Sequence, residues 1–248
     1  MPGKNPIVIE RAPALGDTVA LRGPALAALT AWSPRPGLAV TVADGSGNSY
    51  RARVTELHAD RASLFVFERM KGPAESPLEI ILLQALPDKE RMELIIEKAA
   101  ELGADVIVPW KAERGVGLDE RDARQKKSRG WQKRALKAAR QCRRGKVPFI
   151  APYADLDAAL DYAAGADLKI VLWEEARAPL KKILESTAAP RSVAIMIGPE
   201  GGLTPAEVET AERSGFISAS LGPRVLRTET AAIAALALAQ YALGDLGS

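Results

Sequence analysis

The fold of this chain is decided by the stretch Ile197-Gly198-Pro199-Glu200-Gly201-Gly202-Leu203-Thr204-Pro205-Ala206-Glu207. It continues an apolar run over Val193–Ile197 that is typical of a buried strand. Thr204 and Glu207 have the spacing of a helix-capping box, and Pro205 suits the first position of a helix. The stretch therefore predicts a strand, then a glycine-rich turn, then a helix.

The glycine-rich turn is a candidate ligand site. Gly198, Gly201 and Gly202 lack side chains, so backbone N–H and C=O groups can approach a ligand closely. Ligands of α/β proteins bind at the carboxyl ends of parallel strands, which is where this turn would lie. A tight strand–helix connection that binds nothing would carry the same glycines.

A second informative stretch is Leu221-Gly222-Pro223-Arg224-Val225-Leu226-Arg227-Thr228-Glu229-Thr230-Ala231, which follows a predicted short strand over residues 216–220. We expect Thr228 to cap a helix. Arg224 and Arg227 lie just before that helix, where positive charge is unfavourable for its dipole. A local conflict of this kind indicates a functional role, the alternative being two solvated surface arginines.

Buried strands alternate with helical periodicity around these stretches. Apolar runs over residues 79–85, 106–108, 168–173 and 193–197 predict strands, and residues 92–102 place apolar side chains at helical spacing. This alternation predicts an α/β domain with a mostly parallel sheet.

The first 70 residues show a different pattern. Alternating apolar residues on both sides of the turn cluster Asp44–Asn48 predict a hairpin, and residues 64–67 predict a further strand. Several short strands in so few residues indicate a small β-barrel. The linker-like composition of residues 71–77 separates a domain of residues 1–72 from one of residues 73–248.

Charge is concentrated in one segment. The chain of 248 residues has a formal net charge of +3, yet residues 121–146 hold twelve basic side chains against Asp122 alone, a charge of +11 that leaves −8 elsewhere. We expect a helix from about Asp122 to Cys142 within this segment. Such a concentration indicates contact with a polyanion, either nucleic acid or phosphate, and a solvated helix face is the alternative.

Composition excludes several classes of protein. One cysteine and one histidine, His58, exclude an intrachain disulfide, a Cys-rich zinc site and a multi-histidine metal centre, so we expect no metal. The N-terminal residues lack the apolar core of a signal peptide. The apolar stretch Ala231–Leu243 is shorter than the roughly 20 residues that span a bilayer. We therefore expect a cytoplasmic protein with no membrane partner.

The two glycine-containing stretches, taken together, resemble the SPOUT methyltransferase superfamily. Within it, the chain is similar to the bacterial 16S rRNA uracil-N3 methyltransferases, the RsmE family. Supporting segments in the same order are residues 89–103, Glu113-Arg114, Gln141-Cys142 and Val147-Pro148. The resemblance covers roughly Leu86 to Ala231, most of the predicted second domain.

The resemblance implies a C-terminal SPOUT-type α/β domain with a deep trefoil knot and a small N-terminal PUA-like β-barrel that helps bind RNA. It implies an enzyme that transfers a methyl group from S-adenosylmethionine to N3 of a uridine in 16S rRNA, with rRNA or the small ribosomal subunit as partner. It also implies a homodimer. Two alternatives are a SPOUT enzyme acting on another RNA, such as tRNA, and a non-catalytic dimeric RNA-binding protein of the same fold.

The resemblance also assigns candidate site residues. It places S-adenosylmethionine against Leu172, Ile197, Gly198, Gly201, Leu221, Gly222, Leu226 and Thr230. Arg227 is the candidate for stabilising the uracil anion, and Glu200 or Glu229 would accept the N3 proton or offset the sulfonium charge. Candidates for RNA contact are Lys89, Arg91, Arg114, Lys133, Lys137, Arg140, Arg143, Arg144 and Arg224.

Two segments depart from the family pattern. A basic Arg-Val-Leu-Arg stretch of the N-terminal domain is replaced here by Thr30-Ala31-Trp32-Ser33, and a Glu-Gln-Ser/Cys-Gly-Arg element by Arg140-Gln141-Cys142-Arg143-Arg144. A shift of phosphate contacts from the barrel to the basic helix would explain both departures.

Overall fold

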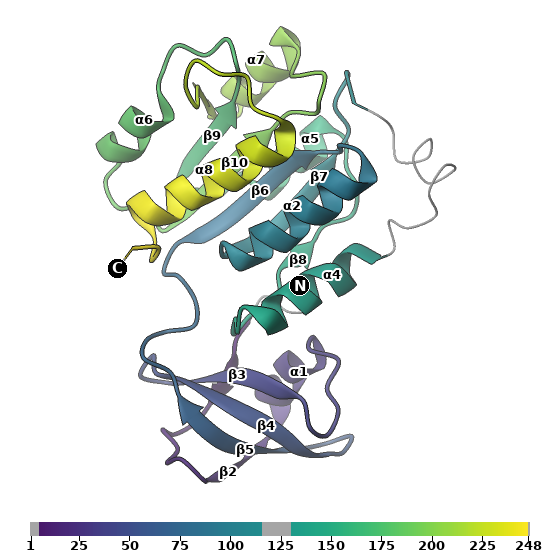
Figure 1. The fold of residues 1–248 in the computed structure, drawn as a ribbon, viewed down its shortest axis with the longest axis vertical. Helices are drawn as coiled ribbons and strands as arrows, with labels where there is room; N and C mark the ends of the chain where they lie inside the picture. The colour runs from purple at the N-terminus through teal and green to yellow at the C-terminus, as the bar shows by residue number, and fades with distance from the viewer. Residues whose placement is uncertain (1–4, 116–129, 248) are drawn as a thin grey trace. The chain divides into compact units, whose positions relative to one another are not determined.

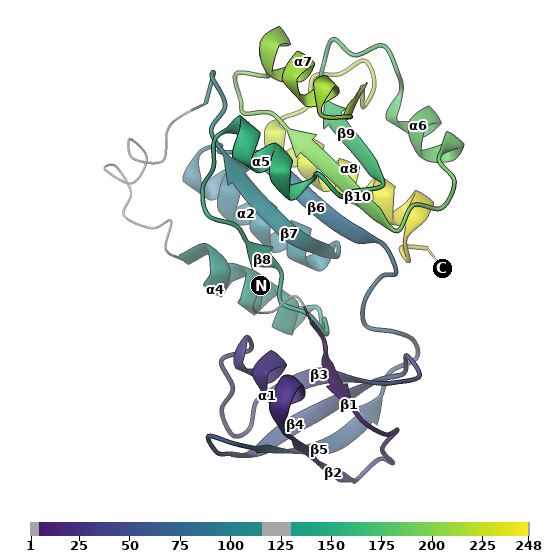
Figure 2. The same cartoon turned by 180° about the vertical axis from the view of Figure 1, so that it is seen from behind.

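The computed structural model describes residues 5–115 and 130–247 (Figures 1 and 2). The chain forms two compact units, one of Met1–Glu75 with Leu136–Phe149 and one of Ser76–Ala135 with Ile150–Ser248. The segment Leu136–Phe149 therefore groups with the N-terminal residues, although sequence patterning places it in the second domain. Of the twelve clustered basic residues, five lie outside the described residues: Arg121, Arg124, Lys126, Lys127 and Arg129.

The first unit is built on a five-stranded sheet with the order β1-β3-β4-β5-β2. Its elements are β1 (Ile7–Ile9), β2 (Thr18–Leu21), α1 (Gly23–Thr30), β3 (Ala39–Asp44), β4 (Ser49–Leu57) and β5 (Ala62–Arg69). The predicted hairpin is confirmed, because β3 and β4 pair antiparallel with Val40 opposite Ala52. Both side chains are buried in the core of this unit, together with Trp32 and Leu64.

The second unit contains a six-stranded sheet with the order β11-β9-β10-β6-β7-β8. Its strands are β6 (Glu79–Ala85), β7 (Ala104–Trp110), β8 (Phe149–Ile150), β9 (Leu168–Leu172), β10 (Ser192–Ile197) and β11 (Ile217–Ala219). Pairing from β11 through β9, β10 and β6 to β7 is parallel throughout, which confirms the predicted α/β domain with a mostly parallel sheet.

Helices cover both faces of this sheet. They are α2 (Lys89–Glu101), α5 (Leu156–Tyr162), α6 (Leu180–Ser186), α7 (Pro205–Arg213) and α8 (Thr228–Leu243), whereas α4 (Trp131–Gln141) begins in the second unit and ends in the first. Figure 1 shows α2 and α8 across one face, and Figure 2 shows α5 and α7 on the other. No helix in the described part of the chain combines the length and apolar character needed to cross a membrane.

Helix ends follow the sequence at two sites and depart from it at a third. Asp88 caps α2 by accepting a hydrogen bond from the backbone of Arg91, and the capping box of Thr204 and Glu207 begins α7. The prediction that Thr228 caps the last helix is wrong. Arg227 is the N-cap of α8 and Thr228 is the first helical residue, because its hydroxyl is hydrogen-bonded to another loop.

Candidate functional site

A pocket of about 510 Å³ lies where three neighbouring parallel strands end. β9, β10 and β11 end at Leu172, Ile197 and Ala219, and the loops that follow them line the pocket. The two glycine-containing stretches therefore line the same pocket, although thirteen residues separate them in the chain. This is the edge of the sheet at which α/β proteins bind ligands.

Hydrogen bonds join the two glycine-containing stretches to each other and to the strand β6. The Thr228 hydroxyl donates to the carbonyl oxygen of Gly198 at 2.6 Å. The Gln84 amide in turn donates to that hydroxyl at 3.0 Å and to the carbonyl oxygen of Ala85 at 2.9 Å. Gln84 is fully buried, and its Oε1 has no hydrogen-bond partner among the described residues. A glutamine inside the apolar strand β6 was the signal that could have revealed this contact from sequence.

The glycines of the turn are required by close packing. Gly202 has a φ of +73°, and a Cβ atom there would lie 2.7 Å from the Glu174 carboxylate. A Cβ atom on Gly198 would lie 2.9 Å from the Leu203 side chain. Gly222, with a φ of +117°, instead has open space where its Cβ atom would be. The first stretch is thus packed against protein, whereas the second presents bare backbone to the cavity.

An ion-pair cluster joins the pocket to helix α2. Arg91 Nη1 lies 2.7 Å from Glu200 Oε1, and Arg91 Nε lies 3.6 Å from Glu229 Oε2. The backbone N–H of Asp88 also donates to Glu200 Oε1 at 2.9 Å. The hydrogen bond to Glu200 raises the pKa of Arg91, so the guanidinium stays charged between the two carboxylates.

The candidate cofactor residues converge on the pocket with one exception. Those that line it are Leu172, Ile197, Gly198, Gly201, Leu221, Gly222 and Leu226. Thr230 is absent from its lining, although Thr228 and Ala231 on either side of it take part.

Two of the three candidate catalytic residues line the cavity, and the third lies outside its lining. Arg227 and Glu200 line the cavity. Glu229 lies outside the lining, and its Oε2 is buried without a hydrogen bond to the described residues. Its carboxylate pairs with Arg91.

The candidate RNA-contact residues near the pocket have different surroundings. Arg224 is exposed and lines the cavity. Arg114 Nη1 lies 3.4 Å from the carbonyl oxygen of Gly201, at the back of the glycine-rich turn. Lys89 is half-buried in the first turn of α2. Arg91 is also a candidate for RNA contact, and in the structure its guanidinium pairs with Glu200 and Glu229.

The remaining candidates for RNA contact lie in and after α4. Lys133 and Lys137 are exposed, and Arg143 pairs with Glu68 at 3.3 Å. Arg140 donates to the carbonyl oxygen of Trp32. The prediction for Arg144 is wrong, because its side chain is only 5% exposed and pairs with Glu75 at 2.7 Å.

A parallel α/β sheet with a pocket made by two glycine-containing loops defines a ligand-binding α/β protein. Comparison with known proteins identifies its family: residues 74–240 match the family model described as RNA methyltransferase domain. This chain belongs to that family, which confirms the resemblance seen in the sequence. No group of three or more potential metal-ligating side chains lies together among the described residues.

The similarity to individual relatives extends over most of the chain. It is 34% identical over 201 residues to ribosomal RNA small subunit methyltransferase E of Bacillus subtilis, covering 79% of this chain and 78% of that protein. It is 36% identical over 207 residues to the Mycobacterium bovis protein of the same name, covering 82% and 78%. It is also similar to the crystal structure of a Neisseria gonorrhoeae ribosomal RNA small subunit methyltransferase E bound to S-adenosyl methionine. The TM-score is 0.67 at 32% identity, with 96% of this chain and 97% of that chain covered.

Proposed function

We propose that this chain is an S-adenosylmethionine-dependent methyltransferase that methylates N3 of a uridine in 16S rRNA. The observation that carries the proposal is the single pocket built by both glycine-containing stretches. It belongs to a chain of the RNA methyltransferase family whose relatives are named for the small subunit rRNA. A similar structure contains S-adenosyl methionine.

The residues of the pocket fit S-adenosylmethionine. A volume of about 510 Å³ is within the usual range for a pocket that takes a small organic ligand. Bare backbone at Gly222 allows close approach, and the carboxylates of Glu174 and Glu200 line a cavity that must accept a cation. The seven lining residues among the cofactor candidates would hold it, with Thr230 just beyond them. When bound, it supplies a methyl group carried on a positively charged sulfur.

The chain must then favour a uracil that has lost its N3 proton. The Arg227 guanidinium, at the cavity wall, stabilises that developing negative charge. Glu200 is better placed than Glu229 to accept the proton. Both hydrogen bonds of Glu200 within the described chain end on Oε1, so Oε2 is the oxygen that remains for the substrate. Glu229 lies outside the cavity lining and pairs with Arg91, which balances the charge of both carboxylates.

RNA recognition draws on basic residues outside the cofactor pocket. Arg224 lies at the pocket, and Lys133 and Lys137 are exposed on α4. A base that reacts at N3 must leave its stack, which favours a uridine in an unpaired segment of rRNA. These arginine and lysine residues would bind the phosphates on either side of it.

The proposal includes the wider architecture of the family. Residues 1–72 form a PUA-like RNA-binding barrel, residues 73–248 form the methyltransferase domain, and the loops around the pocket thread into a deep trefoil knot. The enzyme is a cytoplasmic homodimer. The five-stranded sheet of the first unit and the parallel sheet of the second support the two-domain assignment, and light scattering of the purified chain would test the dimer.

Methyl transfer tests the function. Radioactive S-adenosylmethionine is incubated with the full chain and with naked 16S rRNA, small ribosomal subunits or tRNA. We expect label in 16S rRNA or small subunits. Label confined to tRNA, or label in no RNA despite measurable cofactor binding, would contradict the proposal.

A further inference from the structure

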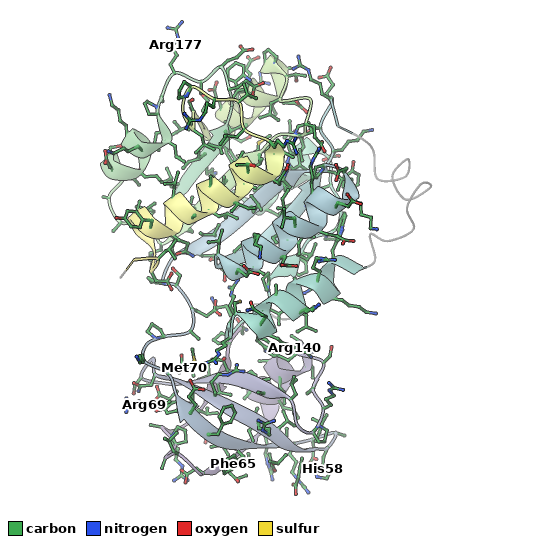
Figure 3. The ribbon with its side chains drawn as sticks, in the orientation of Figure 1. His58, Phe65, Arg69, Met70, Arg140 and Arg177 are labelled. Atoms are coloured by element: carbon green, nitrogen blue, oxygen red, sulfur yellow. The ribbon has the colours of Figure 1, made fainter. Side chains whose placement is uncertain are left out.

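Two exposed aromatic side chains lie on one strand of the first unit. Phe65 and Phe67 belong to β5 and are 39% and 37% exposed, whereas Leu64 and Val66 between and beside them are fully buried. Half of the four phenylalanines of the chain are therefore turned away from a core. Figure 2 shows α1 in front of the small sheet, and Figure 3, from the opposite side, shows Phe65 on the face that α1 does not cover.

A β-bulge sets the position of the second ring. Ala52 of β4 pairs with Val66 and Arg51 pairs with Glu68, so the register passes over Phe67. A bulge leaves one residue unpaired in the ladder and redirects its side chain. Phe65 and Phe67 are two residues apart and both exposed, so their Cα atoms lie about 6–7 Å apart along the strand.

A guanidinium completes what we call the aromatic face, made of Arg53, Phe65 and Phe67. Arg53 pairs in register with Phe65, and its guanidinium carbon lies 5.6 Å from the centre of the Phe67 ring. Its Nη1 donates to the carbonyl oxygen of Gly37 at 3.1 Å, so its charge is not neutralised by that contact. Rings beside a guanidinium offer the two kinds of flat surface on which nucleic-acid bases stack.

Positive charge exceeds negative charge beside this face. Arg51, two residues before Arg53, donates to the Thr41 hydroxyl, and that hydroxyl donates to the carbonyl oxygen of Arg143. Burial and the nearby charge of Arg143 lower the pKa of Arg51, while Glu68 acts in the opposite direction. Glu68 also pairs with Arg143 at 3.3 Å. Glu68 therefore pairs with the exposed Arg143 and acts only electrostatically on the buried Arg51.

The whole first unit has the charge of a polyanion-binding protein. Residues 1–75 and 136–149 contain fourteen lysines and arginines against seven aspartates and glutamates, a formal charge of +7, which leaves −4 on the rest of the chain. The apolar part of the aromatic face is two partly exposed rings, with the exposed Thr18 opposite Phe65 on β2. That surface is small for a protein interface but sufficient for one or two bases.

We propose that the aromatic face stacks one or two unpaired bases of the RNA substrate, while the exposed guanidiniums of Arg53 and Arg143 bind the adjoining phosphates. This inference rests on the proposed function, because it concerns how the enzyme binds bases of its RNA substrate other than the one that reacts.

Fluorescence anisotropy with the full chain tests the proposal. The probe is a labelled ten-nucleotide single-stranded RNA of adenosine and uridine, alone or annealed to its complement. Replacing both rings by alanine, Phe65→Ala with Phe67→Ala, is expected to weaken single-strand binding roughly fivefold or more and duplex binding much less. Replacing both by tyrosine keeps the stacking surface and should restore binding. Val8→Ala, an exposed apolar residue on β1 of the same sheet, is the matched control.

Salt dependence separates stacking from charge. The alanine pair should leave the slope of log affinity against log salt unchanged, whereas Arg53→Gln should lower it by about 0.7 if it releases one phosphate contact. Single-strand binding equal to wild type in the alanine pair, with an unchanged melting temperature, would overturn the proposal and leave the face to a protein partner. An equal loss for single strand and duplex would also overturn it.

The same variants distinguish this inference from the proposed function. Cofactor binding by calorimetry should be unchanged in the alanine pair, because the pocket lies in the other unit. Absence of methyl transfer by the wild-type chain would count against the proposed function and leave the anisotropy comparison valid. Normal RNA binding by the alanine pair would count against the aromatic face alone.

Discussion

The hydroxyl of Thr228 donates a 2.6 Å hydrogen bond to the carbonyl oxygen of Gly198 and so fastens the last loop of the pocket to the glycine-rich turn. Thr228 is only 5% exposed, and the same hydroxyl accepts a hydrogen bond from the buried amide of Gln84. Two loops that are separated in sequence are thus joined to each other and, through Thr228, to Gln84, a buried residue of the strand β6.

Thr228→Val removes both hydrogen bonds while keeping the shape of the side chain. The buried Gln84 amide then keeps only its hydrogen bond to Ala85, and the carbonyl oxygen of Gly198 loses its hydroxyl donor, which should lower the free energy of unfolding by about 1–3 kcal/mol. We also expect weaker binding of S-adenosylmethionine by calorimetry, because the two loops that form the pocket are no longer joined. Thr228→Ser keeps the hydroxyl and is the control. Valine and serine variants with equal cofactor affinity would show that the bond does not shape the pocket.

Arg91→Gln tests whether this arginine organises the pocket or contacts RNA. Removing the guanidinium leaves the carboxylates of Glu200 and Glu229 without their shared counter-charge. We expect kcat to fall and the KM for S-adenosylmethionine to rise, while the salt dependence of RNA binding stays as in wild type. Lys89→Gln, at the start of the same helix, is the comparison. A smaller slope of log RNA affinity against log salt, with an unchanged KM for S-adenosylmethionine, would show that Arg91 contacts RNA instead.

Arg144 and Lys137 should respond differently to substitution. Arg144→Ala removes the ion-pair partner of the partly buried Glu75, which keeps hydrogen bonds from the backbone of Gly145 and Lys146, so we expect a loss of about 1–3 kcal/mol in the free energy of unfolding by urea denaturation. Lys137→Ala changes an exposed side chain and should lower RNA affinity and its salt dependence with little change in stability. The reverse pattern would mean that the two residues have been assigned to the wrong roles.

Much of the fold could be predicted from the sequence because strand and helix periodicity are local. The strands of the parallel sheet, the β3–β4 hairpin and the α7 capping box follow from residues a few positions apart. Helix α1 has only eight residues, mostly alanine and leucine, and offers too little periodicity to be predicted.

The surroundings of the site residues depend instead on pairing between distant parts of the chain, which local patterns do not show. Arg144 meets Glu75 from 69 residues away, and Arg91 meets Glu200 from 109. The sequence predicts Thr228 as a helix cap because it does not show that the Thr228 hydroxyl donates to the carbonyl oxygen of Gly198, 30 residues away. A run of basic residues predicts positive potential, but only tertiary structure decides which members remain available to RNA.

Asp44 makes the stability of the first unit sensitive to acid. Its carboxylate accepts hydrogen bonds from the side chain and backbone of Asn48 and from Ser46, and these lower its pKa below the ordinary 3.8. A lowered pKa in the folded state contributes stability that is fully present above pH 3.8 and is lost as the pH falls through the folded value. Asp44→Asn should therefore be less stable than wild type at pH 7, with a smaller difference at pH 3. Urea denaturation at both pH values measures this, and an equal difference at both would contradict the assignment.

The most direct measurement of the central claim is the identity of the methylated nucleoside. Small ribosomal subunits that lack the modification are incubated with the chain and S-adenosylmethionine, and the rRNA is digested and separated by liquid chromatography and mass spectrometry. We predict one N3-methyluridine per 16S rRNA with the wild-type chain and, with Arg227→Ala, a rate lower by about 100-fold or more at nearly unchanged cofactor affinity. A methyl group on another atom or base, or wild-type rates in the Arg227 variant, would contradict the account.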